Sequence, residues 1–220
     1  MTTILIATIA ITAIISFYGF NNLAFFEKYK FNVGAVLHQK EYIRLLSAGF
    51  LHADITHLIF NMMTLYFFGP SVIYYFGDLG FIIIYIGSIL LGNIFSMLIY
   101  KKQSWYSAIG ASGGVSGILF AAIAMAPKEA NIGFLFIPGL RIPGFVFGLL
   151  YFGYSVYSML NPRQNDNIGH AAHLGGAFFG LVYAVGMAPE IAISNALFLG
   201  IMALPLLYLA YEIFVRKRIG

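Results

Sequence analysis

The stretch Gly110-Ala111-Ser112-Gly113-Gly114-Val115-Ser116-Gly117 stands at the start of an apolar segment that continues to about residue 127. Its glycines allow the backbone to bend, and they allow another helix or a substrate to approach Ser112 closely. The N–H groups at a helix start have no partners within the helix, so they could also bind an oxyanion. Small residues four apart, such as Gly113 and Gly117, are also typical of helix packing in membranes. This stretch alone therefore does not establish catalysis.

The composition of the whole chain is that of a membrane protein. Apolar residues make up 60% of the 220 residues and charged residues 9%, whereas a soluble domain carries about a quarter charged residues. A membrane-spanning helix needs about 20 mostly apolar residues. Seven segments fit: about 3–20, 55–76, 79–100, 111–127, 143–160, 168–188 and 191–215. We therefore predict an all-α, polytopic membrane helix bundle that forms a single domain over residues 1–220.

Several classes of protein are excluded by what the sequence lacks. The chain has no cysteine, which excludes disulfides, catalytic thiols and thiolate metal sites. Its net charge of +4 comes from scattered loop lysines and from Arg216-Lys217-Arg218, and no basic stripe with interleaved aromatic residues indicates a nucleic-acid partner. That basic cluster is typical of a helix end among lipid headgroups, so the bilayer is an expected partner. The half-polar interval 21–54 likewise suits a loop in the headgroup layer.

His173 is the second candidate for chemistry, in Ala172-His173-Leu174-Gly175-Gly176 near the start of the sixth apolar segment. Gly176 and Gly180 share its helical face, which predicts a smooth surface for a neighbouring helix. If that neighbour is the segment that begins near Ser112, the hydroxyl and the imidazole meet at a similar depth. A hydroxyl beside an imidazole is the arrangement of a nucleophile and its general base. For His173 alone, a structural histidine is an equal alternative.

The second apolar segment adds His57 and Asn61, which point to the same helical face because they are four residues apart. Both side chains can donate hydrogen bonds, as a tetrahedral oxyanion requires. The alternative is a polar pair that holds helices together. His52 and Asp54 precede this segment, and Asp54 is expected to cap its helix.

No acid suits the third position of a catalytic triad. Asp166 and Glu190 lie in the loops on either side of the sixth segment, and the fourth and sixth segments contain no carboxylate. The predicted site is therefore a Ser-His dyad. His170, three residues before His173, could support the base or donate to the oxyanion. A water-filled cavity lined by His52, His57, Asn61 and His170 would give water access to the dyad.

Together these residues resemble the rhomboid family of intramembrane serine proteases. The resemblance covers Glu41-Tyr42-Ile43-Arg44, His52, His57-x-x-x-Asn61, Gly110-x-Ser112-Gly113 and Ala172-His173-x-Gly175-Gly176. It implies a six-helix core at about residues 1–188 and one further C-terminal transmembrane helix at about 191–215. It also implies Ser112 as nucleophile, His173 as general base, and an oxyanion hole formed by His57, Asn61 and the backbone N–H of Ser112. No metal or other cofactor is expected, and the supporting residues would be Gly110, Gly113, His170, His52 and Arg44.

The sequence departs from the family pattern in two places. Ile43 stands where the family usually has Trp before the arginine. Ser116 stands where the family often has a bulky residue that packs on the histidine, so another residue must orient His173. The charges are also unusual, because a family-like topology puts ten of the twelve Lys and Arg residues outside, against the positive-inside rule. We follow the motif, which implies an active site that opens to the outer face. The size of the chain and its lack of targeting extensions fit a bacterial inner membrane, and an organelle membrane is the alternative.

The sequence thus predicts a serine endopeptidase that cleaves peptide bonds in or beside transmembrane segments of membrane-anchored proteins. One alternative is a catalytically silent rhomboid-like protein that binds membrane clients, although such relatives usually lack the serine or the histidine. Another is a small transporter with His57, Asn61, His170 and His173 on its pathway. A transporter is expected to have paired halves with broken helices, and no such symmetry is found.

Overall fold

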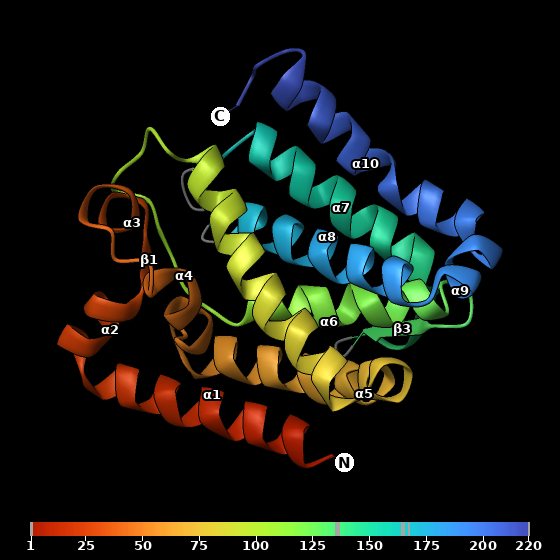
Figure 1. Cartoon of the computed structure of the whole chain (residues 1–220), viewed down its shortest axis with the longest axis horizontal. Helices are drawn as coiled ribbons and strands as arrows, with labels where there is room; N and C mark the ends of the chain where they lie inside the picture. Colours follow the sequence, from red (N-terminus) through yellow and green to blue (C-terminus); the bar gives the residue numbers. More distant parts are fainter. Residues whose placement is uncertain (1, 135–136, 164–165, 167, 220) are drawn as a thin grey trace.

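The computed structural model describes residues 2–134, 137–163, 166 and 168–219, and it consists mainly of helices in one bundle (Figure 1). The long helices are α1 (Thr3–Asn21), α5 (Ile55–Ile99), α6 (Ser112–Met125), α7 (Gly144–Leu160), α8 (His170–Met187) and α10 (Ala196–Phe214). Each coincides with one or two of the seven apolar segments. The predicted all-α, polytopic bundle is thereby confirmed.

Short elements fill the interval between α1 and α5, at one end of the bundle (Figure 1). They are α2 (Leu23–Tyr29), β1 (Phe31–Asn32), α3 (Val33–Gln39), α4 (Arg44–Ser47) and the 3-10 turn η1 (Ala48–Phe50). We call this interval, residues 22–54, the first loop. Strand β1 pairs antiparallel with β2 (Ser107–Ala108), which lies between α5 and α6. The first loop is compact because Phe31, Val33, Val36 and Ala48 form a small apolar core of their own.

Helix α5 contains two of the predicted segments. At Gly77 the backbone is non-helical, with φ 69° and ψ 178°, and this break divides α5 into two arms (Figure 1). The break falls where the sequence predicted the connection between the second and third spans. At the start of α5, Oδ1 of Asp54 accepts a hydrogen bond from the backbone N–H of His57 at 2.8 Å. The predicted N-cap is therefore confirmed.

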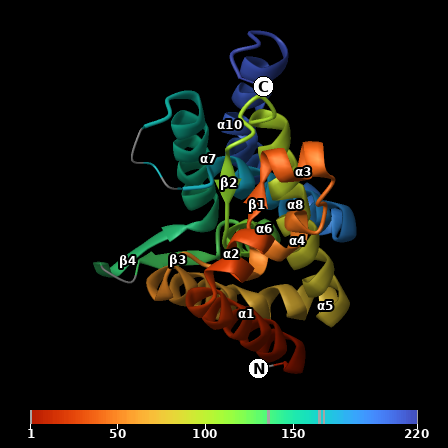
Figure 2. The ribbon, with the colours of Figure 1, turned by 90° about the vertical axis from the view of Figure 1, so that its left-hand side faces the viewer.

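The connection between α6 and α7 forms a β-hairpin that the sequence analysis did not predict. Strands β3 (Asn131–Phe134) and β4 (Ile137–Pro143) pair antiparallel, with Ile132 opposite Ile142. The hairpin projects from the bundle (Figure 2). A short helix, α9 (Pro189–Ser194), joins α8 to α10.

The centre of the bundle is α6, in which every residue from Gly113 to Met125 is buried. It packs against α5 and α8, and these three helices make the most extensive contacts in the fold. A Cβ placed on Gly176 of α8 would lie 2.1 Å from the carbonyl oxygen of Gly113, and a Cβ on Gly180 would lie 2.1 Å from that of Gly117. Only glycine permits helices to approach so closely. The predicted glycine face of α8 therefore contacts α6.

On the other side of α8, α7 lies between α8 and α10 (Figure 1). The end of α10 is joined to the end of α7, because Nη2 of Arg218 donates a hydrogen bond to the backbone oxygen of Leu160 at 3.1 Å. Near the same end, the buried carboxylate of Glu212 accepts a hydrogen bond from Arg216 at 3.0 Å.

The outer surface of the bundle is apolar. Among the described residues, α1, α5 and α10 are long and apolar enough to cross a membrane, and α6 and α7 are shorter apolar helices. Their outward faces expose large side chains such as Ile14, Tyr74, Leu197 and Phe214. Apolar surface on this scale is rare on soluble monomers and is expected against lipid. The chain is an integral membrane protein.

Candidate active site

The predicted nucleophile and base lie together at the starts of two neighbouring helices. Ser112 is the first residue of α6, and His173 lies in the first turn of α8. The Oγ of Ser112 is 2.6 Å from Nε2 of His173. When the ring carries its proton on Nδ1, Nε2 accepts a hydrogen bond from the hydroxyl. That is the geometry in which a general base can remove the serine proton.

His52 fixes the backbone just before the nucleophile. Its fully buried ring accepts a hydrogen bond at Nε2 from the backbone N–H of Ala111, at 3.2 Å, and Nδ1 lies 2.8 Å from Oγ of Ser16 in α1. Because Nε2 accepts, Nδ1 carries the proton and donates to Ser16, whose hydroxyl donates to the backbone oxygen of Phe50 at 2.9 Å. Burial, with a smaller contribution from His57, lowers the pKa of His52 to about 3, so the ring is neutral as this pattern requires.

His57 lies beside the residue that precedes this backbone, Gly110. A Cβ on Gly110 would be 2.8 Å from Nε2 of His57 and 3.6 Å from Oγ of Ser112, so the ring and the hydroxyl flank the same residue. Gly110 has φ 116°, which side chains rarely tolerate, and its missing side chain leaves room for the ring. Of the predicted oxyanion side chains, His57 is the one that lies beside Ser112.

Asn61 is buried one turn further along α5. Its Nδ2 donates a hydrogen bond to the backbone oxygen of His57 at 2.9 Å, within its own helix. In the described part of the chain, no hydrogen bond joins Asn61 to Ser112. The described hydrogen bond uses one of the two N–H groups of the Asn61 amide, and the predicted oxyanion role of this residue stays a prediction.

His170 is paired with a carboxylate rather than with the base. Its Nε2 lies 3.1 Å from Oδ2 of Asp166, while its ring centroid is 6.5 Å from that of His173. The backbone N–H of Ile168, and then the ring of His170, donate hydrogen bonds that lower the pKa of Asp166. Nε2 of His170 thus faces Asp166, and its ring stands edge-on to that of His173, so the expectation that His170 supports the base or donates to an oxyanion stays a prediction.

A cavity of about 660 Å³ opens beside Ser112. His57 and His170 line it as predicted, together with Asp166 and with aromatic side chains at Tyr100, Trp105 and Tyr106. The prediction that His52 and Asn61 also line the cavity is wrong. The ring of His52 is enclosed by protein, and the side chain of Asn61 is buried against its own helix. Within the described ranges, no group of three or more His, Asp or Glu residues is arranged to bind a metal ion.

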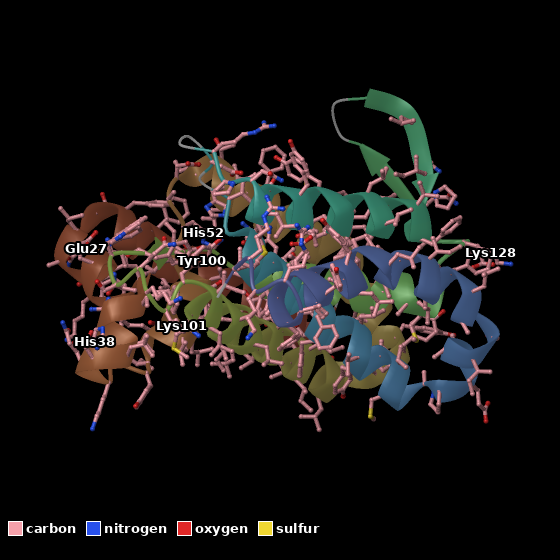
Figure 3. The ribbon with its side chains drawn as sticks, turned by 90° about the horizontal axis from the view of Figure 1, so that it is seen from above. Glu27, His38, His52, Tyr100, Lys101 and Lys128 are labelled. Carbon is pink, nitrogen blue, oxygen red and sulfur yellow. The ribbon has the colours of Figure 1, made fainter. Side chains whose placement is uncertain are left out.

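Arg44 supports the site indirectly, through the first loop. Its Nη1 donates hydrogen bonds to the backbone oxygens of Glu27 at 2.7 Å and of Lys30 at 2.9 Å, and so joins α4 to the end of α2. The adjoining turn η1 contacts the site directly, because the backbone oxygen of Ala48 accepts a hydrogen bond from the N–H of Gly110 at 3.0 Å. Figure 3 shows that Glu27, His38, His52 and Tyr100 all lie at this end of the molecule.

His173 also has an aromatic neighbour that the sequence analysis did not identify, Tyr151 of α7. The two ring centroids are 6.3 Å apart, and the ring planes differ by 25°. The hydroxyl of Tyr151 lies 2.7 Å from Oγ of Ser116. The only signal in the sequence was Ser116 itself, whose small size required an orienting group from elsewhere.

Comparison with known proteins places these features in one family. Residues 39–190 match the family model described as the rhomboid domain. The chain is 31% identical over 172 residues to the rhomboid protease GluP of Bacillus subtilis, and the aligned stretch covers 78% of this chain and 32% of that protein. It is 30% identical over 148 residues to RHOMBOID-like protein 12, mitochondrial, of Arabidopsis thaliana, and this alignment covers 60% of this chain and 43% of that protein. It is also 30% identical over 136 residues to the putative rhomboid protease YdcA of B. subtilis, covering 62% of each chain. The matches thus span from about a third to just under two thirds of these relatives' lengths.

Proposed function

The chain belongs to the rhomboid family, and on that basis we propose that it is an intramembrane serine endopeptidase. Its substrates are membrane-anchored proteins, cut in or beside their transmembrane segments. The observation that carries this proposal is the 2.6 Å separation between Oγ of Ser112 and Nε2 of His173, beside a cavity that opens into an otherwise apolar bundle. Polar groups inside a membrane are costly, so a hydroxyl and an imidazole in contact at such a place point to chemistry.

The first half of the reaction forms an acyl-enzyme. Nε2 of His173 takes the hydroxyl proton of Ser112 while Oγ bonds to the carbonyl carbon of the scissile peptide. The resulting oxyanion accepts hydrogen bonds from the backbone N–H of Ser112, from the ring of His57 and from the side-chain amide of Asn61. The C–N bond then breaks, and the leaving amine takes its proton from His173.

The second half restores the enzyme. Water enters through the cavity and loses a proton to Nε2 of His173 as its oxygen bonds to the acyl carbon. The bond from that carbon to Oγ breaks, the carboxylic acid product leaves, and Oγ regains a proton from His173. His52 takes no part in these transfers, and its role is to hold the backbone N–H groups around Ala111 in place.

The test is the replacement of each member of the dyad. Ser112→Ala and His173→Ala should each lower cleavage of a model transmembrane substrate by at least about a thousandfold. Ser71→Ala, which removes a hydroxyl near the break of α5 at Gly77, should cleave at the wild-type rate. Wild-type cleavage by Ser112→Ala would refute the proposal.

A client-binding protein without activity is the alternative, and a covalent probe separates the two. A fluorophosphonate bonds only to an activated serine, so the peptidase is labelled at Ser112 and the labelling is lost in His173→Ala. Purified wild-type protein that is folded, binds a transmembrane peptide and takes up no probe would be the silent relative.

A further inference from the structure

His173 needs support from outside its own helix. Its described hydrogen bond is the one from Ser112 at Nε2, and a single bond does not fix the rotation of an imidazole about its Cβ–Cγ bond. The residue one turn after the nucleophile, Ser116, is buried but too small to cover the ring. The face of the His173 ring is instead approached by Tyr151 from α7, at 6.3 Å between centroids and nearly parallel. The ring of His170 stands near it edge-on, with centroids 6.5 Å apart.

Tyr151 is itself held on several sides. Its hydroxyl is within 2.7 Å of Oγ of Ser116, which fixes the end of the side chain. Phe120, one turn further along α6, lies against its ring at 5.3 Å between centroids, and Phe147 lies one turn before it on α7 at 5.8 Å. A ring held at both its tip and its edges presents a fixed surface to a neighbouring ring.

We propose that Tyr151 is a positioning residue, which keeps Nε2 of His173 directed at Ser112, and that Ser116 sets the position of Tyr151. This inference rests on the proposed function. It assigns the nucleophile, the base and the residue that orients the base to three different helices, α6, α8 and α7. The small side chain at Ser116 is then a requirement, because a larger one would occupy the place of the tyrosine hydroxyl.

The experiment compares variants that keep or remove the ring. Tyr151→Leu should lower kcat on a transmembrane substrate by about tenfold and leave KM within about twofold, because the ring acts on the base and not on substrate binding. Tyr151→Phe keeps the ring and should retain kcat within about threefold of wild type. Tyr157→Leu is the matched control: it makes the same substitution at an exposed position of α7 that does not line the cavity, and its kcat per folded molecule should equal that of the wild type. The rate at which a fluorophosphonate labels Ser112 should fall most in Tyr151→Leu and less in Tyr151→Phe. This rate does not depend on the binding of a transmembrane substrate, so it reports on the dyad alone.

A second pair of variants tests the link to Ser116. Ser116→Ala and Tyr151→Phe remove opposite ends of one hydrogen bond, so the double variant should be no slower than the slower single variant. A double variant whose losses multiply would refute the coupling of Ser116 to Tyr151. Tyr151→Leu with kcat per folded molecule and labelling rate within twofold of wild type would refute the positioning role. Wild-type protein that neither cleaves nor takes up the probe would instead refute the proposed function, so the two failures are distinguishable.

Discussion

His52 joins α1 to the residue before the nucleophile although it does not line the cavity. Its two ring nitrogens have different partners, the backbone N–H of Ala111 and the hydroxyl of Ser16. Both partners are buried with it, so neither can turn to water if the ring is lost. A buried donor without an acceptor costs more than the hydrogen bond itself contributed.

We therefore expect His52→Phe to lower the free energy of unfolding by about 1–3 kcal/mol, because it leaves the N–H of Ala111 unpaired while keeping a ring of similar shape. Labelling of Ser112 by a fluorophosphonate should also slow, since Ala111 adjoins the nucleophile. His38→Phe, on the exposed face of α3, is the control and should change stability by less than about 0.5 kcal/mol. Thermal unfolding in detergent and the labelling rate are the measurements, and equal results for the two variants would contradict this role for His52.

At this scale the sequence predicted residue types better than residue contacts. The meeting of Ser112 with His173 could be expected because each stands at the start of a glycine-lined segment, and the cap at Asp54 follows from its place before α5. The rotamer of Asn61 could not, because i and i+4 spacing fixes a face and not the direction of an amide. Tyr151 could not either, since its segment carries several tyrosines and no pattern distinguishes the one that faces α8.

Among the elements, α6 and α8 set the distance between nucleophile and base. Their backbones touch at Gly176 and Gly180, and the atoms that a side chain would meet are carbonyl oxygens rather than flexible side chains. The pair cannot adapt by a rotamer change, so any added bulk must separate the helices. Since Ser112 and His173 stand at the starts of these two helices, the same movement would open the contact between them.

Gly176→Ala should therefore destabilise the protein by about 1–3 kcal/mol, the usual cost of overpacking, and lower kcat as well. Gly186→Ala in the same helix is the matched control. Nothing lies within 4 Å of its added Cβ, so it should be neutral or stabilise the helix by up to about 1 kcal/mol. Unfolding in detergent and cleavage assays on both variants provide the comparison. A Gly176→Ala variant with wild-type stability and activity would show that α6 and α8 can accommodate the added methyl group.

The sequence predicted the helices better than the connections. Apolar length located α1, α6, α7, α8 and α10, and Gly77 divides α5 where the connection was expected. The hairpin of β3 and β4 was missed because strand pairing depends on a register between two segments, which neither segment specifies by itself. The short helices of the first loop were missed for a similar reason, since they depend on a local cluster around Phe31.

For the whole molecule, the two ends of the bundle differ in charge. Lys101 lies at the end that carries the first loop, and Lys128 lies at the other (Figure 3). The end with the candidate site holds ten of the twelve Lys and Arg residues, counted from the loops at each end. The positive-inside rule taken alone would turn this end to the cytoplasm, whereas the family motif predicts the outer face.

We expect the end with the site to face outward, and the lack of cysteine makes the test direct. A membrane-impermeant maleimide should label Lys101→Cys in intact cells, and should label Lys128→Cys only after the membrane is opened. Both positions are exposed, so both variants should react fully in detergent. The reverse labelling pattern in intact cells would show the opposite orientation, which the positive-inside rule predicts.

In the described part of the chain, no residue of the C-terminal helix α10 lines the cavity beside Ser112, yet this helix borders α7, which carries Tyr151. Helix α7 lies between α10 and α8, and Arg218 ties the tail to the last turn of α7. Helix α10 packs against α7, and Tyr151 of α7 lies against the imidazole of His173, so a displacement of α10 can reach the base through α7. A fusion, a lipid or a binding protein that displaces the C-terminal tail would therefore lower the activity without entering the cavity, because His173 would lose its fixed orientation.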